Sequence, residues 1–409
     1  MYSIITGLYR YIIMKKVLPL AILLTLITCI SCNNENGFKE KLPAAINTYS
    51  DIVYANYQDA LSTAQVLDTA IDNLVADPSQ NTLDATKSAW LSAREAYGQT
   101  EAFRFYGGPI DDEDGPEGQL NAWPLDESYI DYVTASTNGT DAVDGSNIIN
   151  SPNNFPIISP EVIAGLNENG SETNISSGYH AIEFLLWGQD QSSGPGGGER
   201  SFTDYVTDGT GTNGNQDRRG RYLQSVSELL VSDLQSLVDE WAPNGTYRAF
   251  FNSDDQLDNS LERILNGIGK LSKGELAGER MFVAFDLRSK EDESSCFSDN
   301  THRDIVTNAL GIQNVLRGTY TRLDGTTVSG TSIIELVAIG NKTLADELRD
   351  LSANSVASTE AIQAPFDQEF LNELGRERIL EAINLLRSQG DKIAEVATEL
   401  GFTVDPSDI

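Results

Sequence analysis

Apolar residues recur every three or four positions over most of the chain, which is the spacing of an amphipathic helix. The longest run steps through residues 46–74 without a break and stops at Asp77-Pro78, where a helix is expected to end. Similar runs cover residues 223–241 and 379–400. These three segments predict long helices.

Shorter runs with the same spacing predict further helices near residues 82–106, 177–187, 258–288, 302–317, 331–352 and 367–376. No alternating strand pattern of comparable length accompanies them, so the predicted fold class is all-α. Long antiparallel helices pack as bundles, and 409 residues exceed one compact core of ordinary size. We therefore expect two helical-bundle domains, residues 44–245 and 246–409.

Glycine and proline gather in three stretches that are predicted to be long loops, residues 107–124, 134–176 and 189–217. The last loop contains the glycine-rich run 194–198. That run has neither the flanking strand nor the lysine of a phosphate-binding loop, so it is interpreted as a flexible connection.

The N-terminus has the layout of a secretory signal peptide, predicted to span residues 1–31 with Met14 as the true start. Lys15 and Lys16 form its basic part. The apolar run 17–27 follows and is too short for a membrane span.

Ile30-Ser31-Cys32 resembles the bacterial lipobox, which predicts that Cys32 is lipidated and that residues 32–43 form a tether. The protein would then be a membrane-anchored lipoprotein of the bacterial cell envelope, at the outer membrane or the periplasmic face. The alternative is an ordinary signal peptide that is cleaved near Cys32.

The chain carries 61 acidic and 28 basic residues, a formal net charge of −33. A field of that sign repels nucleic acid and anionic lipid headgroups and attracts cations. Nucleic-acid binding is therefore not expected. For most of the surface acids, solubility is a sufficient explanation.

The segment NISSGYHAIEFLLWGQD contains His180, one of only two histidines, and Glu183 three residues later. Ser176 or Ser177 is expected to cap a helix that begins near Gly178, which places His180 and Glu183 on one face. The other helix positions are apolar all round, so the pair is expected to be buried.

A buried carboxylate needs a partner, and a metal ion or a structural ion pair with histidine would each supply one. The zinc-peptidase pattern H-E-x-x-H is absent. With so few histidines, oxygen atoms must complete any metal site, which suits iron, manganese or zinc.

Two other stretches combine charges with chemistry-bearing residues. In WLSAREAYGQTEAFRFY, the residues Arg94, Tyr97, Glu101 and Arg104 form a polar stripe along one helix face. SKEDESSCFSDNTHRD holds Cys296, Asp299 and the second histidine, His302. A solvated charged surface is the alternative for both.

Together these segments resemble the imelysin family, whose G-x-H-x-x-E motif is similar to GYHAIE here. WLSAREAYGQTEAFRFYGGPID, NAWPLDESYID, DRRGRYL and EDESSCFSDNTHRDI resemble further blocks of that family. The resemblance implies two helical bundles with a cleft near the H-x-x-E helix. It also implies envelope lipoproteins tied to iron uptake, and an insulin-cleaving peptidase activity from which the family takes its name.

The resemblance also implies roles for individual residues. The metal ligands that it implies are His180, Glu183, Glu101 and Asp299, with Glu95 and Asp112 as more remote candidates. Gly178 is expected to be structural, because a missing side chain lets the helix start pack tightly. The residues expected to line the pocket are Arg94, Tyr97, Arg104 and Trp187.

Three functional interpretations follow. In the first, a lipid-anchored protein binds iron (zinc or manganese as alternatives) in an interdomain cleft and passes it to an uptake transporter. In the second, the metal holds a water molecule and Glu183 or Glu101 acts as general base of a peptidase. In the third, the protein is a surface interaction module with a structural His–Glu pair.

Overall fold

The computed structural model describes residues 2–133 and 147–407, with side chains described from residue 36 onward. Helices make up 65% of the structure and strands 2%, so the all-α prediction is confirmed. The helices of the first part are α1 (Tyr2–Ala76), α2 (Gln80–Thr100), η1 (Glu101–Phe103), α3 (Glu117–Leu120), α4 (Glu127–Ile130), α5 (Pro160–Leu166), α6 (Gly178–Trp187), η2 (Phe202–Tyr205) and α7 (Gln216–Trp241).

The second part contains more helices and one short hairpin. These elements are α8 (Thr246–Phe251), α9 (Leu257–Lys270), η3 (Leu271–Phe282), α10 (Val283–Leu287), η4 (Lys290–Asp292), α11 (Thr301–Arg317), β1 (Thr319–Thr321), β2 (Thr327–Ser329), α12 (Ile333–Gly340), α13 (Lys342–Glu360), α14 (Phe366–Glu369) and α15 (Glu373–Glu399). In the described residues, the buried apolar side chains form one continuous core.

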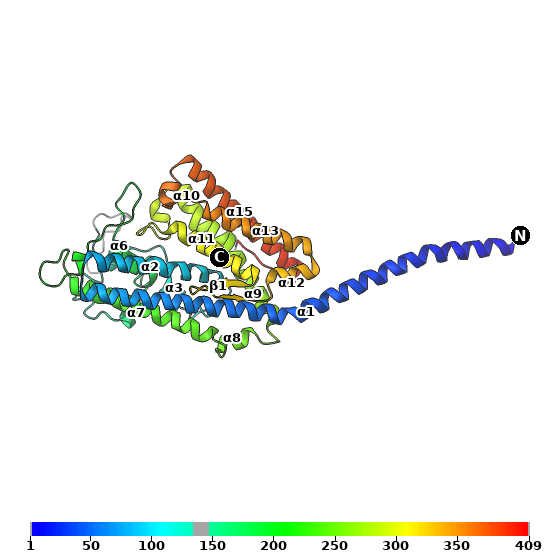
Figure 1. Ribbon diagram of the computed structural model, residues 1–409, viewed down its shortest axis with the longest axis horizontal. Coiled ribbons are helices and arrows are strands. Elements are labelled where there is room, and N and C mark those ends of the chain that lie inside the picture. The colour runs from blue at the N-terminus through cyan, green and yellow to red at the C-terminus, as the bar shows by residue number, and fades with distance from the viewer. Residues whose placement is uncertain (1, 134–146, 408–409) are drawn as a thin grey trace.

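Helix α1 is the axis of the molecule, with α2 and α7 packed along it (Figure 1). It ends at Ala76, directly before Asp77-Pro78, as the sequence predicts. The chain turns back at once because Ser79 caps α2, exchanging hydrogen bonds with Thr82 in a capping box. This tight turn makes α1 and α2 antiparallel neighbours.

The N-terminal part of α1 projects away from the helical body (Figure 1). The side chains of residues 1–35, including Cys32, lie outside the described residues, so the signal-peptide and lipidation predictions stay predictions. Within the part of the chain that the structure describes, no helix combines the length and apolarity needed to cross a membrane.

The second part packs onto the first through α11, which lies against α2 and also against α13. Helix α15 covers η3, α9 and α13. The division into domains at residue 245 stays a prediction. In the structure, α1 and α2 both contact helices on either side of residue 245.

Several predicted boundaries differ from the structure. The helix expected over 331–352 is two helices, α12 and α13, because Asn341 leaves helical geometry and its side chain caps α13. The expected helix 367–376 is also wrong, since α14 ends at Glu369 and Asn372 caps α15. The loops expected at 107–124 and 189–217 contain the short helices α3 and η2.

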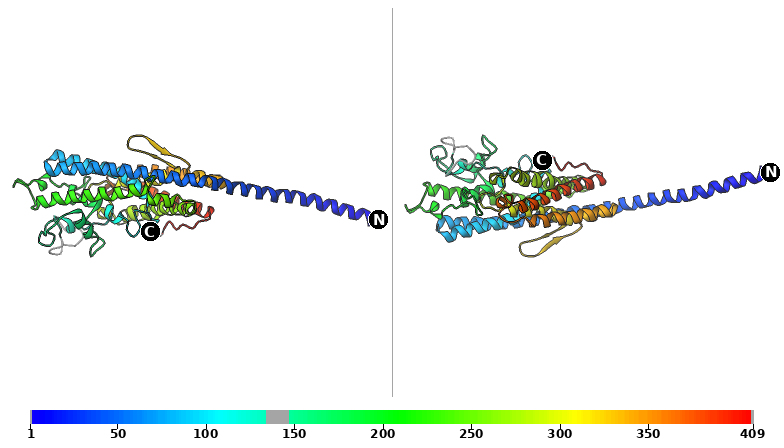
Figure 2. Two further views of the ribbon diagram at one scale, coloured as in Figure 1. Left: turned by 90° about the horizontal axis from the view of Figure 1, so that it is seen from below. Right: turned by 90° about the horizontal axis from the view of Figure 1, so that it is seen from above.

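The predicted loop at 134–176 is only partly visible: residues 134–146 lie outside the described residues, and α5 occupies part of the remainder. The hairpin β1–β2 has no counterpart among the sequence predictions. It projects from the helical body on the α1 side (Figure 2), where the Tyr320 hydroxyl donates to Asp59 of α1 at 2.9 Å.

A buried charge network fixes the start of α7. Asp131 is fully buried and accepts hydrogen bonds from Arg219 at 2.6 and 3.1 Å and from Arg200 at 2.7 Å. Although burial raises it, the two guanidiniums hold the pKa of Asp131 below its usual range. Asp131 therefore contacts both buried arginines, and the buried Asp204, 3.3 Å from Arg200, supplies the second negative charge.

We expect Asp131→Asn to lower the free energy of unfolding by about 3–5 kcal/mol, because buried Arg219 loses its acidic partner and Arg200 keeps only Asp204. The stability from Asp131 is present above the unfolded pKa of about 3.9 and is lost as the pH falls through the lower folded value. Urea unfolding should therefore show a large difference from wild type at pH 7 that shrinks below about pH 4.

Asp346→Asn is the matched control, since Asp346 also pairs with two basic residues, Lys342 and Arg349, but on the exposed surface of α13. It should leave the urea midpoint close to that of wild type because solvent screens this pair. Equal small effects of both substitutions would contradict the role assigned to Asp131.

Candidate functional site

Helix α6 carries the H-x-x-E motif, and all ten of its residues are buried. Its first residue, Gly178, has φ 80°, and a Cβ there would lie 2.5 Å from the carbonyl oxygen of Leu120. Only glycine fits this position without displacing the backbone. Ser177 is the N-cap residue, as predicted, but its hydroxyl bonds to Gln119 and makes no capping hydrogen bond to the helix backbone.

His180 and Glu183 contact each other directly. The distance from His180 Nδ1 to Glu183 Oε2 is 2.8 Å, and both side chains are almost completely buried. The other carboxylate oxygen, Oε1, accepts hydrogen bonds from the Ser298 backbone N–H at 2.9 Å and from its hydroxyl at 2.6 Å. Glu183 therefore links α6 to the segment that precedes α11.

Burial disfavours charge on both members of the pair. Burial and the nearby Arg94 guanidinium lower the pKa of His180 to about 3. Burial raises the pKa of Glu183 to about 8, although the Ser298 hydrogen bonds oppose this shift. Both shifts disfavour an ion pair, so at neutral pH the imidazole of His180 is uncharged and hydrogen-bonded to Glu183.

His180 lines a cavity of about 370 Å³, whereas Glu183 does not. The cavity lies between residues from both predicted bundles: Arg94, Arg104, Glu117, Asn121, Ala122, Trp123, Pro124, Glu168, His180, Glu275, Glu279, Arg280, Val283, Asp292 and Ser294. Trp123 packs its edge against the imidazole, with ring centroids 5.1 Å apart. Among the described residues, the imidazole hydrogen-bonds through Nδ1 alone.

Glu101 lies behind the cavity wall and is held by basic residues. Its Oε2 accepts from Arg104 at 2.8 Å and Arg280 at 2.6 Å, and its Oε1 accepts from Asn121 at 3.3 Å. Burial alone would raise the pKa of Glu101, but the Arg280 and Arg104 guanidiniums lower it to about 2. Glu101 thereby positions two arginines at the cavity, and its role as a third metal ligand stays a prediction.

Arg94 is buried at the other side of the same wall. It donates to Asp304 at 3.1 Å and to Asn121 at 2.6 Å, which connects it to Glu101 through the Asn121 side chain. Tyr97, predicted to line the pocket, is instead fully buried against Tyr179, with ring centroids 4.7 Å apart.

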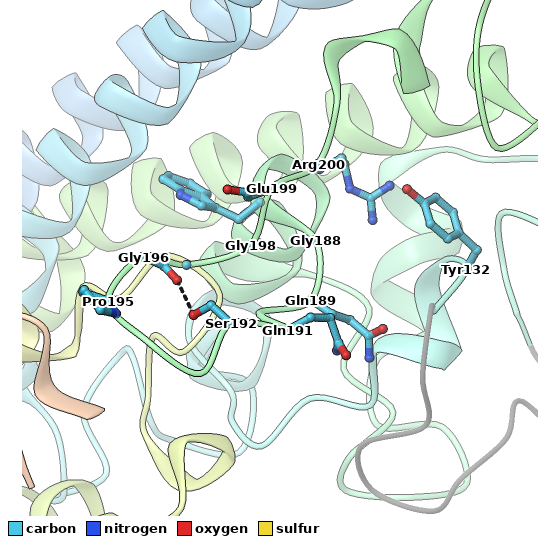
Figure 3. A pocket seen from close by; sticks show the side chains of 12 residues that line it. Tyr132, Gly188, Gln189, Gln191, Ser192, Pro195, Gly196, Gly198, Glu199 and Arg200 are labelled. Carbon is cyan, nitrogen blue, oxygen red and sulfur yellow. Dashed lines mark hydrogen bonds between the residues drawn. The ribbon is translucent and has the colours of Figure 1, made fainter. Parts of the chain in front are cut away.

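Trp187 faces a different cavity, of about 440 Å³, which the loop after α6 encloses (Figure 3). The glycine-rich run 194–198 forms part of its wall. The end of this run is closely packed and is not a flexible connection. A Cβ on Gly197 would lie 2.2 Å from the carbonyl oxygen of Phe297, and Gly198 donates a hydrogen bond to that oxygen at 2.8 Å.

The structure brings Asp299 together with Glu293 and Asp367, and one oxygen from each lies within 4.8 Å of the others. Among the described residues, His180, Glu183 and Glu101 form no cluster of this kind. Glu293 and Asp367 were not among the metal ligands predicted from the sequence. Glu293 lies in residues 289–304, a stretch already noted in the sequence for its charges. Nothing in the local pattern relates this stretch to Asp367, which is far away in the chain.

The two remote ligand candidates lie at the surface. Glu95 makes a two-point ion pair with Arg303, with both distances 2.7 Å, and both side chains are more than a third exposed. Asp112 is exposed and accepts a hydrogen bond from the Asp114 backbone. The structure brings neither to the cavity lining.

A family model described as imelysin matches residues 53–393 of the chain. The chain is 23% identical over 352 residues to iron-regulated protein A of Synechococcus elongatus, covering 84% of this chain and 82% of that protein.

Two crystal structures are similar in fold. One, described as an iron-regulated protein A precursor from Parabacteroides distasonis, has a TM-score of 0.68 at 20% identity and covers 88% of this chain and 95% of that one. The other, an imelysin-like protein from Psychrobacter arcticus, has a TM-score of 0.61 at 16% identity and covers 90% and 98%.

The state of the pair can be read by NMR of the metal-free protein, because the chain has only two histidines. We expect the His180 ring signals to stay those of a neutral imidazole from pH 8 down to about pH 4, since burial lowers its pKa to about 3. His302, whose pKa is lowered less, serves as the internal control. Titration of His180 near its ordinary pKa of about 6.5 would contradict the neutral pair.

Proposed function

Because this chain belongs to the imelysin family, we propose that it is a cell-envelope protein that binds a metal ion, iron, for uptake. The binding place in this proposal is the cavity beside His180. The observation that carries it is the orientation of the imidazole: Nδ1 is committed to Glu183 while the residue lines the cavity.

A histidine that binds a metal commonly directs its second ring nitrogen to a carboxylate, which fixes the ring orientation and increases its basicity. Glu183 supplies that carboxylate at 2.8 Å, and Ser298 holds Glu183 in turn. In this arrangement Nε2 of His180 would bind the metal, while Glu183 would hydrogen-bond to Nδ1 on the other side of the ring.

The charges around the cavity fit a cation bound through oxygen. Five carboxylates line it, against three guanidiniums. Arg104 pairs with Glu117 at 2.9 Å, and Arg280 pairs with Glu275 at 2.8 Å, so these four charges largely offset one another. The remaining carboxylates there are Glu168, Glu279 and Asp292. The proposal assigns them as oxygen donors to the ion beside His180. Because no three of these four groups lie within ligand distance of one another in the structure, their side chains would have to move toward the ion when it binds.

Iron is the metal best supported by the comparisons, because the Synechococcus relative is named an iron-regulated protein. One imidazole with several carboxylates is a donor set that suits iron, and also manganese and zinc. We also propose that the protein delivers the ion to an uptake transporter.

The peptidase alternative requires a carboxylate base within reach of a metal-bound water. Glu183 is completely buried, and each of its oxygens already has a hydrogen-bond partner. Glu101 is held by two guanidiniums that keep its pKa at about 2. Neither candidate is placed as a general base, so the geometry favours binding over peptide hydrolysis.

The envelope location rests on the N-terminal segment. The Parabacteroides relative is described as a precursor, which supports an exported protein of this type. We propose that the exported chain is anchored through lipid on Cys32 and that the polar segment 32–43 connects it to the helical body.

Elemental analysis of protein purified without chelator or added metal tests the binding. We expect bound iron in the wild type and a large loss of it in His180→Ala, because the only nitrogen donor at the cavity is removed. His302→Ala is the matched control and should keep its iron, since this second histidine does not line the cavity.

Equal iron content in His180→Ala and wild type would contradict the proposed site. A wild type that binds no added metal would instead favour the structural His–Glu pair. If the iron-loaded protein cleaved insulin chains and Glu183→Gln abolished that cleavage, the peptidase interpretation would replace the binding one.

The anchor is tested separately by membrane fractionation of cells that express the full chain. Cys32→Ser should move the protein from the membrane fraction to the soluble envelope fraction, because it removes the site of lipid attachment. Cys296→Ser is the control, as this buried cysteine lies in the helical body. Unchanged fractionation of Cys32→Ser would contradict lipidation at Cys32.

A further inference from the structure

Three carboxylates from distant parts of the chain meet near the start of α11. Glu293 and Asp299 belong to the segment between η4 and α11, and Asp367 belongs to α14. One oxygen from each lies within 4.8 Å of the other two. Among the described residues, this is the only group of three acidic, histidine or cysteine side chains with such geometry.

Four of the six carboxylate oxygens at this cluster lack hydrogen-bond partners, while Asp367 Oδ2 accepts from Gln368 at 2.6 Å and Asp299 Oδ2 accepts from the Gly196 backbone. Neither oxygen of Glu293 has one, and that side chain is only 1% exposed. Oδ1 of Asp367 and Oδ1 of Asp299 are also buried and unpartnered, and Asp367 is 4% exposed. None of the ion pairs among the described residues involves these three carboxylates.

Such an arrangement is unfavourable without a counter-charge. Buried carboxylates lose hydration and repel one another at these distances. The same forces raise the pKa of Glu293 well above its usual range, through burial first and the Asp367 charge second. The Thr301 side chain opposes this shift, but its geometry falls short of a hydrogen bond to either Glu293 oxygen. A cation among the oxygens would remove both penalties, since it supplies the missing partner for each of them.

We propose that Glu293, Asp299 and Asp367 form a binding site for a hard divalent cation, namely calcium. All three donors of this group are carboxylate oxygens, which hard cations prefer. The group contains no imidazole or thiolate, the ligands that softer metals favour. Calcium–oxygen bonds of about 2.3–2.6 Å allow ligand atoms on opposite sides of the ion to be up to about 5 Å apart. The three oxygens lie within 4.8 Å of one another, which is inside that span.

This ion would join three segments of the chain. Asp299 Oδ2 accepts a hydrogen bond from the Gly196 backbone at 2.8 Å, so the loop around the second cavity would be fixed along with α14. Ser298, the residue before Asp299, holds Glu183 through two hydrogen bonds. The calcium site is distinct from the cavity beside His180, but it would hold the segment that orients the His180–Glu183 pair.

The test is calcium binding by the chelator-treated full chain, measured by calorimetry and by the unfolding temperature with and without calcium chloride. Calcium should raise the unfolding temperature of the wild type, because it binds only the folded state. Glu293→Gln should weaken calcium binding by at least about tenfold, since affinity follows the charge of the ligand set. Without calcium this variant should be no less stable than wild type, because one unpaired buried charge has been removed.

Asp367→Asn is the second variant and should behave in the same way, so that one misfolded substitution does not decide the result. Asp350→Asn, on the exposed face of α13, is the control and should keep the calcium response of the wild type. His180→Ala should also bind calcium normally, which separates this site from the proposed iron site.

A wild type whose unfolding temperature and calorimetric trace do not respond to calcium would overturn the proposal. So would variants that bind calcium as tightly as wild type. Magnesium binding that equals or exceeds calcium binding would overturn the assignment to calcium.

Discussion

The structure of the candidate site depends on one buried carboxylate, that of Glu183. One oxygen contacts His180 on its own helix, and the other receives both donors of Ser298 from the segment before α11. A carboxylate with no access to water must find such partners inside the protein. Because the partners come from two distant parts of the chain, satisfying Glu183 also fixes how α6 lies against the second half of the molecule.

The buried arginines around the cavity also need partners inside the protein, because they too have little access to water. Arg104 and Arg280 meet on Glu101, and Arg94 meets Asp304, so each buried guanidinium has an acidic partner. These pairs hold the charged groups in place while leaving His180 uncharged at the cavity surface. The result is a polar wall with one uncharged imidazole, which is the nitrogen donor that the proposed metal site would use.

Much of the fold follows from local sequence. The end of α1 at Ala76 and the burial of α6 are both dictated by nearby residues, a proline in one case and continuous apolar side chains in the other. The contact between His180 and Glu183 is likewise local, because three helical positions bring them together. These features were predictable.

Tertiary partners were not predictable in this way. Nothing near Glu101 in the sequence indicates Arg280, and nothing near Asp299 indicates Asp367. The glycine-rich run was taken for a flexible connection because its close contact with Phe297 depends on packing between distant segments. The sequence also predicts one helix over residues 331–352, because the apolar spacing continues across Asn341. The structure divides this segment into α12 and α13 at Asn341, whose side chain caps α13.

The central claim is that His180 presents one nitrogen to a metal among oxygen donors, with Glu183 behind the ring. X-ray absorption at the iron edge of the iron-loaded wild type tests this most directly, because scattering from an imidazole ring is distinct from that of oxygen ligands. The account predicts a single imidazole in a shell otherwise composed of oxygen. A shell of oxygen alone, with no ring scattering, would contradict it.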